Sequence, residues 1–250
     1  MKIVWLSSYP KSGNTLVRML LYSYLFSEPK ESIQIDEKIP DLHKLLSRGL
    51  ALKANIDSNL IIKSHFSFSD EHPYHKNTQG FIYVVRNPRD VLLSNARYLG
   101  VSSEELRDFA INFIDQVGVS KWKRMNMGNW SEHFSSWFQA TSSYPSCFIK
   151  YEDLKINPKN SFKKIIEFLG IELDDGKLEV AVKASSLENA RKMEESDKKK
   201  GDKSLFDNLP KGLPFVGEGR INQSLSFLGS DVEEMYKRRF GKFINVFGYE

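Results

Sequence analysis

Residues 6–16, with the sequence LSSYPKSGNTL, have the composition of a loop that binds phosphate. They follow an apolar stretch and precede a helical pattern that begins near Thr15. At such a junction the backbone N–H groups of the helix start point into the loop, and the helix dipole favours an anion. Lys11 adds a positive charge. The loop therefore predicts binding of a phosphate or a chemically similar anion.

The loop differs from the nucleotide-binding fingerprint GxxxxGK[ST]. Its lysine comes early, at Lys11, and Asn14 stands where the fingerprint has its lysine. We therefore expect a ligand other than Mg-ATP. A P-loop kinase stays open as an alternative, because it shares the strand–loop–helix arrangement.

Four short apolar runs are typical of buried parallel strands, because none alternates polar with apolar residues. They cover residues 3–6, 60–62, 81–85 and 147–149. Helical patterns lie between and after them, at 15–26, 89–99, 104–116, 130–140 and 158–169. This alternation predicts a doubly wound α/β fold, in which helices flank a central parallel sheet. We expect residues 1–250 to form a single domain.

Basic and polar side chains follow each of the four predicted strands. They are Lys11 after the first strand, Lys63 and His65 after the second, Arg86 after the third and Tyr151 after the fourth. Parallel sheets bind ligands beyond the carboxyl ends of their strands. These residues therefore predict a site for a multiply charged anion.

Composition limits the classes of ligand and compartment. The chain has 36 Lys and Arg against 32 Asp and Glu, and its net charge of +4 is too small to indicate nucleic-acid binding. The single cysteine, Cys147, excludes an intramolecular disulfide, and we expect it to be a buried structural thiol. No signal peptide and no apolar stretch long enough to cross a bilayer is visible. We expect a cytoplasmic protein without membrane partners.

Five motifs resemble, in order, those of the cytosolic-type sulfotransferases. They are YPKSGNT at 9–15, KSH at 63–65, YVVRNPRDVLLS at 83–94, WSEHFSSWF at 130–138 and KYEDLKINP at 150–158. The resemblance implies a P-loop-like α/β domain with a phosphosulfate-binding loop after the first strand. It also implies transfer of a sulfuryl group from 3′-phosphoadenosine 5′-phosphosulfate (PAPS) to a hydroxyl or amine of a small or medium acceptor. The second product is adenosine 3′,5′-bisphosphate (PAP).

The loop and the second strand end suit the chemistry of this reaction. Sulfuryl transfer resembles phosphoryl transfer, in which the group moves in line and charge builds on the leaving oxygen. Lys11 and the backbone N–H groups of the loop are expected to neutralise that charge. The loop residues concerned are Ser12, Gly13, Asn14 and Thr15. His65 is the expected general base, and Lys63 is expected to steady the sulfuryl oxygens.

Other residues are expected to hold the rest of PAPS. The resemblance places Arg86 and Ser94 at the 3′-phosphate and Tyr151 at the adenine. An arginine makes charge-assisted hydrogen bonds of about 1.5–3 kcal/mol each, which would select PAPS over a nucleotide without that phosphate. We expect no metal, because cationic side chains neutralise the charge.

The chain departs from the family pattern around the nucleotide. Leu16 and Leu187 stand where the family usually has a tryptophan and a phenylalanine against the adenine. The segment FVGEGRINQSL at 215–225 differs from the family's RKGxxGxW element. Gly219 matches that element, and we expect Arg220 to replace its cations at the 3′-phosphate. Glu218 is expected to point outward.

The acceptor pocket is expected in segments 29–58 and 100–128. Its candidate walls are Phe109, Phe113, Trp122 and Met125. These segments match no specific pattern, so the acceptor is not predicted. The family's KxxxTVxxxE dimerisation element is absent, so the oligomeric state is not predicted either. A protein that binds PAPS without catalysis and serves a partner stays open as a further alternative.

Three other features carry structural expectations. Trp130, Trp137 and Phe138 are expected in the core, because aromatic residues at helical spacing usually pack there. The mixed-charge run at 191–203 is expected to be a solvated face or loop. The segment at 210–219, rich in proline and glycine, is expected to be a loop.

Overall fold

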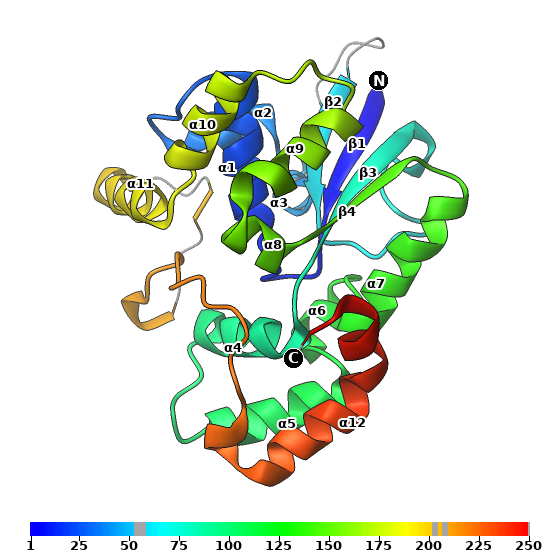
Figure 1. Cartoon of the computed structure of the whole chain (residues 1–250), viewed down its shortest axis with the longest axis vertical. Helices are drawn as coiled ribbons and strands as arrows, with labels where there is room; N and C mark the ends of the chain where they lie inside the picture. The colour runs from blue at the N-terminus through cyan, green and yellow to red at the C-terminus, as the bar shows by residue number, and fades with distance from the viewer. Residues whose placement is uncertain (53–58, 202–204, 207–209, 250) are drawn as a thin grey trace.

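The computed structural model describes residues 1–52, 59–201, 205–206 and 210–249. Its central sheet has four parallel strands in the order β2-β1-β3-β4 (Figure 1). The strands are β1 (Lys2–Ser7), β2 (Asn59–Ser64), β3 (Thr78–Val85) and β4 (Ser146–Lys150). Each strand contains one of the predicted apolar runs, so the prediction of a parallel α/β sheet is confirmed.

The register of the sheet brings the functional strand ends together. Ser7, the last residue of β1, lies opposite Ser64 of β2 and Tyr83 of β3. Val85, at the end of β3, pairs with Lys150 of β4. The loops that follow these strands therefore leave the same edge of the sheet.

Alternating side chains of the strands build two separate cores. On β3, Phe81 and Tyr83 belong to one hydrophobic cluster, whereas Ile82 and Val84 belong to the other. Both faces are covered by helices, which explains why the strands are apolar throughout.

The first cluster is covered by α4 (Pro88–Leu99), α5 (Leu106–Gln116), α6 (Ser120–Arg124), α7 (Trp130–Gln139) and α12 (Ser230–Phe247). The second is covered by α1 (Asn14–Leu25), α2 (Ser32–Lys38), α8 (Tyr151–Ile156), α9 (Pro158–Phe168), α10 (Asp175–Ala184) and α11 (Leu187–Lys200). Figure 1 shows α1, α9 and α10 on one side of the sheet and α5, α7 and α12 on the other. The short helix α3 (Leu42–Ser47) contacts β2.

Local chemistry fixes where the key helices begin. The side chain of Asn87 accepts the N–H of Arg89 at the start of α4, and Pro88 supplies the first helical position. Asn129 and Glu132 form a capping box at the start of α7. These caps fix where the helices that carry Ser94 and the buried Trp130 begin.

Two expectations about the charged and glycine-rich segments need correction or refinement. The run at 191–203 forms most of helix α11, which ends at Lys200, and residues 202–204 lie outside the described residues. This helix is mostly exposed, but its Glu194 and Asp197 are buried. Asp197 accepts the hydroxyl of Ser32, so part of the charged run joins the fold. In the predicted loop at 210–219, residues 210–212 form a short 3₁₀ turn.

Expectations about single side chains were right in part. Trp130 and Trp137 are buried as predicted, but Phe138 is 56% exposed, so its prediction was wrong. Cys147 is partly buried, and burial raises the pKa of its thiol to about 11. The thiol is therefore protonated at neutral pH.

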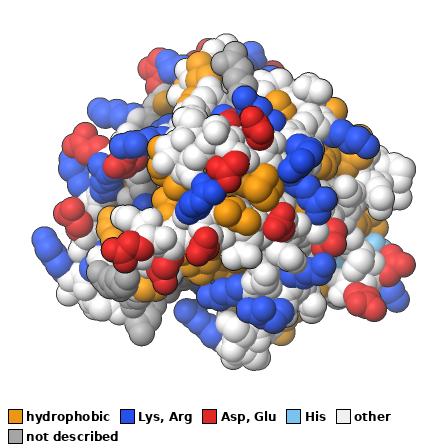
Figure 2. All heavy atoms as spheres, turned by 90° about the horizontal axis from the view of Figure 1, so that it is seen from below, with side chains coloured by type: hydrophobic (Ala, Val, Ile, Leu, Met, Phe, Trp, Pro, Cys, Tyr) orange, Lys and Arg blue, Asp and Glu red, His pale blue; other side chains and the backbone are white. Residues whose placement is uncertain are grey.

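The outer surface shows no strong separation of charge on the face drawn in Figure 2, where basic and acidic side chains are interspersed. Within the described parts of the chain, no helix combines the length and the apolar character needed to span a bilayer.

The carboxylate of Asp90 fastens the C-terminal loop to α4. Asp90 is fully buried and accepts the N–H groups of Asn222 at 3.0 Å and Gln223 at 3.1 Å, and the side-chain amide of Gln223 at 3.0 Å. Nearby, Arg89 pairs with Glu233 at 2.7 Å. The loop that passes the ligand-binding edge is thus tied to the start of α4.

We expect Asp90→Ala to lower the free energy of unfolding by about 2–3 kcal/mol, because buried N–H groups lose their acceptor. Urea unfolding followed by circular dichroism measures this change. Asp90→Asn keeps one acceptor oxygen and serves as the matched control with a smaller loss. An alanine variant within about 0.5 kcal/mol of the wild type would contradict the anchoring role.

Candidate active site

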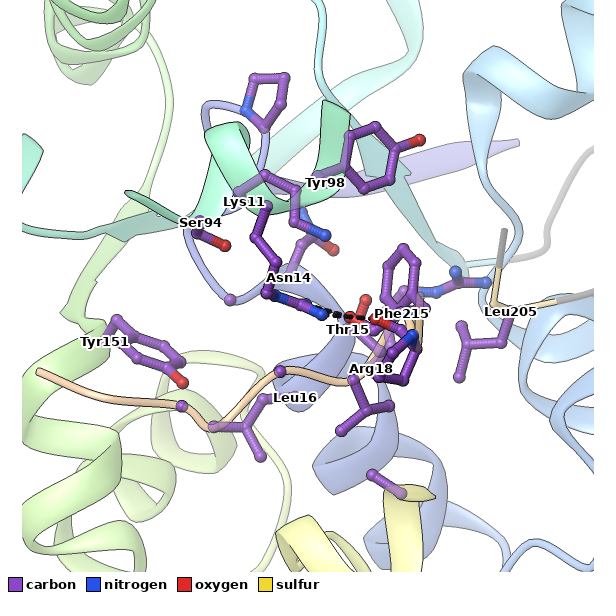
Figure 3. A pocket seen from close by; sticks show the side chains of 18 of the residues that line it. Lys11, Asn14, Thr15, Leu16, Arg18, Ser94, Tyr98, Tyr151, Leu205 and Phe215 are labelled. Atoms are coloured by element: carbon purple, nitrogen blue, oxygen red, sulfur yellow. Dashed lines mark hydrogen bonds between the residues drawn. The ribbon is translucent and has the colours of Figure 1, made fainter. Parts of the chain in front are cut away.

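A cavity of about 1040 Å³ opens at the carboxyl ends of the strands. Its walls come from the loop after β1, the end of β2, α3, α4, the start of α8, α11 and the segment 213–220. All the predicted site residues line it except Ser12. A cavity of this size can hold a nucleotide together with a small second substrate. Figure 3 shows this pocket with Lys11, Asn14, Thr15, Leu16, Ser94 and Tyr151 among its labelled side chains.

The loop after β1 has a left-handed backbone at two positions. Lys11 has φ 72° and Gly13 has φ 105°. A Cβ atom on Gly13 would lie 2.3 Å from Cδ2 of Tyr151, so a side chain here would meet the ring. The side chain of Asn14 donates to the carbonyl of Leu6 and the hydroxyl of Ser8, both at 3.2 Å. Gly13 therefore allows the loop to lie against Tyr151, and Asn14 ties the helix start to the strand end.

Donors of this loop point in different directions. The N–H of Ser12 donates to the carbonyl of Tyr9 at 3.2 Å, and the Ser12 side chain is buried behind the loop. Asn14 and Thr15 form the first turn of α1, where backbone N–H groups have no intrahelical acceptor. The ammonium of Lys11 lies 4.0 Å from the ring centre of Phe215 and 4.4 Å from that of Tyr98.

His65 is held as a neutral imidazole at the end of β2. Its Nδ1–H donates to the carbonyl of Ser8 at 2.6 Å, which leaves Nε2 as the unprotonated nitrogen. Burial, and then the nearby charge of Lys63, lower the pKa of His65 well below its ordinary value of 6.5. The side chain can therefore accept a proton at neutral pH.

Arg86 connects three parts of the pocket. Its Nη1 donates to the carbonyl of Lys11 at 3.0 Å, and its Nη2 donates to the carbonyl of Arg220 at 2.9 Å. The guanidinium carbon lies 4.3 Å from the ring centre of Tyr151. Its buried Nε makes no hydrogen bond within the part of the chain that the structure describes. Ser94 lines the same pocket from α4.

The backbone of the C-terminal loop approaches the pocket wall beside Lys155 and Tyr151. Gly219 has φ 63°, and a Cβ there would lie 3.2 Å from both the ammonium of Lys155 and the hydroxyl of Tyr151. The side chain of Arg220 is 67% exposed and pairs with Glu218, which is 60% exposed. Both side chains line the pocket, so Glu218 does not point wholly away from it, and the role of Arg220 at a phosphate stays a prediction.

Aliphatic residues stand at the two positions where the family pattern has aromatic residues. Leu16, on α1, and Leu187, at the first position of α11, both line the pocket. Tyr151 adds an aromatic wall between the loop and Arg86. The wall is therefore less aromatic than the family pattern but remains apolar.

Several pocket residues were missed by sequence reasoning. Arg97 donates to the carbonyls of Pro214 and Phe215, and Lys155 lines the wall beside Gly219. Helical spacing could have indicated both, because Arg97 lies three residues after Ser94 and Lys155 four residues after Tyr151. Buried Arg18 and Asp41 also line the pocket, and neither carried a sequence signal.

Of the four residues expected to form the acceptor walls, two line the pocket. Trp122 and Met125 line the pocket. Phe109 and Phe113 do not line it: Phe113 is 2% exposed in the core, and Phe109 packs against that core. From segment 29–58, the described lining residues are Asp41, His43 and Lys44, and residues 53–58 lie outside the described residues.

Residues 2–214 match the sulfotransferase domain family. Sulfotransferase 2A1 of Rattus norvegicus is 28% identical over 233 residues, which cover 87% of this chain and 74% of that protein. Sulfotransferase 1B1 of Mus musculus is 30% identical over 194 residues, which cover 73% of this chain and 63% of that protein. The family match ends just before the divergent segment at 215–225.

Solved structures show the same fold. Mouse sulfotransferase SULT7A1 complexed with PAP has a TM-score of 0.67 and 21% identity, with 98% of this chain and 89% of that chain covered. Retinol dehydratase in complex with androsterone and the inactive cofactor PAP has a TM-score of 0.63 and 16% identity, with 96% and 81% covered. The chain belongs to the sulfotransferase family, and its reaction class is the PAPS-dependent sulfuryl transfer that its motifs predict.

Proposed function

We propose that His65, Lys11 and Lys63 carry the transfer of a sulfuryl group from PAPS to a hydroxyl or amine of the acceptor. The observation that supports this most strongly is the neutral His65, fixed through Nδ1 beside the phosphosulfate loop. Nε2 of His65 takes the proton of the acceptor as its oxygen or nitrogen bonds to sulfur. The bond from sulfur to the phosphate oxygen breaks, and that oxygen leaves as part of PAP.

The charge of the leaving phosphate is met by the loop after β1. Lys11 provides positive charge and the first-turn N–H groups of Asn14 and Thr15 provide donors, from neighbouring positions of one loop. Gly13 gives the backbone the close approach that these donors need. Lys63, near His65, is assigned to the equatorial sulfuryl oxygens. These cations neutralise the negative charge that magnesium neutralises in kinases, so the proposed reaction uses no metal.

The remaining contacts of PAPS are proposed from the same pocket. PAP is the nucleotide named in the two solved structures above, and this pocket offers Arg86 and Ser94 for a 3′-phosphate and Tyr151 for adenine. Gly219 and the rim cation Arg220 close the same side. The two N–H groups of Arg86 that now hold backbone carbonyls keep the guanidinium in place beside the loop.

The acceptor is proposed to be a small or medium hydroxylated molecule. Androsterone and retinol are the hydroxylated molecules named in complexes of retinol dehydratase. In this chain Trp122, Met125 and Met127 give the acceptor side an apolar wall. A kinase activity has weaker support, because the loop lacks GK[ST]. A single catalytic unit over residues 1–250, a cytoplasmic location and the absence of nucleic-acid and membrane partners stay predictions.

We expect His65→Asn to lower kcat by about 10²–10⁴-fold, because proton removal from the acceptor loses its base. The dissociation constant of PAP, measured by calorimetry, should stay nearly unchanged. In the wild type, kcat should fall only as the pH drops below 6.5, because protonation of His65 at its lowered pKa removes the base. His75→Asn, a histidine outside the pocket, is the matched control. Full activity of His65→Asn would rule out the base assignment.

Calorimetric titration with PAP, AMP and Mg-ADP tests the nucleotide site. We expect the wild type to bind PAP more tightly than AMP by about tenfold or more, because AMP lacks the phosphate assigned to Arg86 and Ser94. In Arg86→Ala this preference should shrink while AMP binding changes less, so each nucleotide serves as the control for the other. Equal binding of PAP and AMP, or tighter binding of Mg-ADP, would contradict the proposed site.

A further inference from the structure

We propose that Asp41 is a positioning residue for sulfuryl transfer, whose carboxylate holds the ammonium of Lys63 toward the reacting group. This inference rests on the proposed role of Lys63 at the sulfuryl oxygens. Both residues line the active-site pocket together with His65.

Backbone and side-chain contacts join Asp41 to Lys63. Oδ2 of Asp41 lies 2.6 Å from Nζ of Lys63. The N–H of Lys63 donates to the carbonyl of Pro40 at 2.9 Å, and Asp41 and Lys63 form a parallel β-bridge. The residues just before α3 therefore extend the edge of the sheet at the point where β2 reaches the pocket.

The second carboxylate oxygen fixes Asp41 itself. Oδ1 accepts the N–H of His43 at 3.0 Å and of Lys44 at 3.5 Å, so Asp41 is the N-cap of α3. One oxygen thus anchors the aspartate on the helix while the other holds the lysine. This division leaves the lysine ammonium only a narrow choice of positions.

Burial makes the pair strongly interdependent. Asp41 is 7% exposed and Lys63 is 8% exposed. An ion pair taken out of water is not a strong source of stability, but removal of one partner leaves a costly buried charge. A buried pair that lines a pocket is therefore better explained by placement of charge than by stability.

The charges around Lys63 show what Asp41 supplies. Arg18 from α1 and Lys44 from α3 add positive charge, and Arg18 is itself paired with Asp36 at 2.6 Å. His65 follows on the same strand end and is neutral. The carboxylate of Asp41 favours the charged form of Lys63, whereas the charges of Arg18 and Lys44 oppose it.

The directions of the pKa shifts of Asp41 and Lys63 agree with this pairing. Burial alone would raise the pKa of Asp41, but the charges of Lys63 and Arg18 hold it well below its usual range. Burial lowers the pKa of Lys63, and the carboxylate of Asp41 opposes that shift. Asp41 therefore favours the protonated form of Lys63 against the effect of burial.

Asp41→Asn is the direct test, because the amide oxygen can still cap α3 while the negative charge is lost. We expect kcat to fall by about tenfold to a hundredfold, with the dissociation constant of PAP changed less than about twofold. The alkaline limit of the kcat–pH profile should move to lower pH, because Lys63 then loses its proton more easily. Asp41→Glu should recover part of kcat and of the profile.

Asp36→Asn is the matched control, because it removes a carboxylate from a neighbouring buried ion pair that does not include Lys63. It should leave the alkaline limit at its wild-type position. The double variant Asp41→Asn with Lys63→Met should have the kcat of Lys63→Met alone, since the aspartate then has nothing to position.

Three results would overturn the inference. They are a wild-type pH profile and kcat in Asp41→Asn, additive losses in the double variant, and a loss of PAP binding and thermal stability that accounts for the whole fall in kcat. Full activity of Lys63→Met would instead remove Lys63 from the proposed mechanism. If the wild type does not bind PAP, the proposed function itself is contradicted.

Discussion

The guanidinium of Arg86 holds together three segments that form the ligand pocket. It donates to the carbonyl of Lys11 in the loop after β1 and to the carbonyl of Arg220, which lies 134 residues after Arg86 in the chain. It also lies over the ring of Tyr151. A planar, permanently charged guanidinium with five donors in a rigid fork makes arginine suited to such a junction. The positions of Lys11, the C-terminal loop and Tyr151 therefore depend on one buried side chain just after β3.

The two ends of the pocket use charge differently. Around the loop after β1, the cations Lys11 and Arg86 lie near Gly13 and the first turn of α1, an arrangement that suits a ligand with several negative charges. At the end of β2, Lys63 is paired with Asp41, and the neutral His65 follows on the same strand end. The proposed mechanism uses the first arrangement to stabilise the leaving anion and the second to accept a proton and to hold a cation in place.

The sequence predicted the features that arise from local patterns. The strands are buried on both faces, so their apolar runs were visible in the sequence. The motif at 9–15 follows β1 directly, so its place at the end of a strand was visible as well. Contacts between distant segments could not be predicted in this way. Asp41 meets Lys63 because the start of α3 joins the edge of β2, and Phe113 turned out to be core because α12 covers it. No short-range spacing encodes either contact.

The departures in the C-terminal segment concern binding more than chemistry. Arg220 contributes its carbonyl to Arg86, while its side chain pairs with Glu218 at the rim. Lys155 lies beside Gly219 and offers a second positive charge on that wall. The loop therefore reaches the pocket wall although its sequence differs from the family element.

The most direct test of the central claim follows the transferred group. The protein is incubated with a panel of hydroxylated acceptors and either PAPS labelled with radioactive sulfur or ATP labelled on its γ-phosphate. We expect labelled acceptor from PAPS, PAP in equal amount, and no labelled acceptor from ATP. Transfer of label from ATP, or tight PAP binding without labelled product from any acceptor in the panel, would contradict that claim.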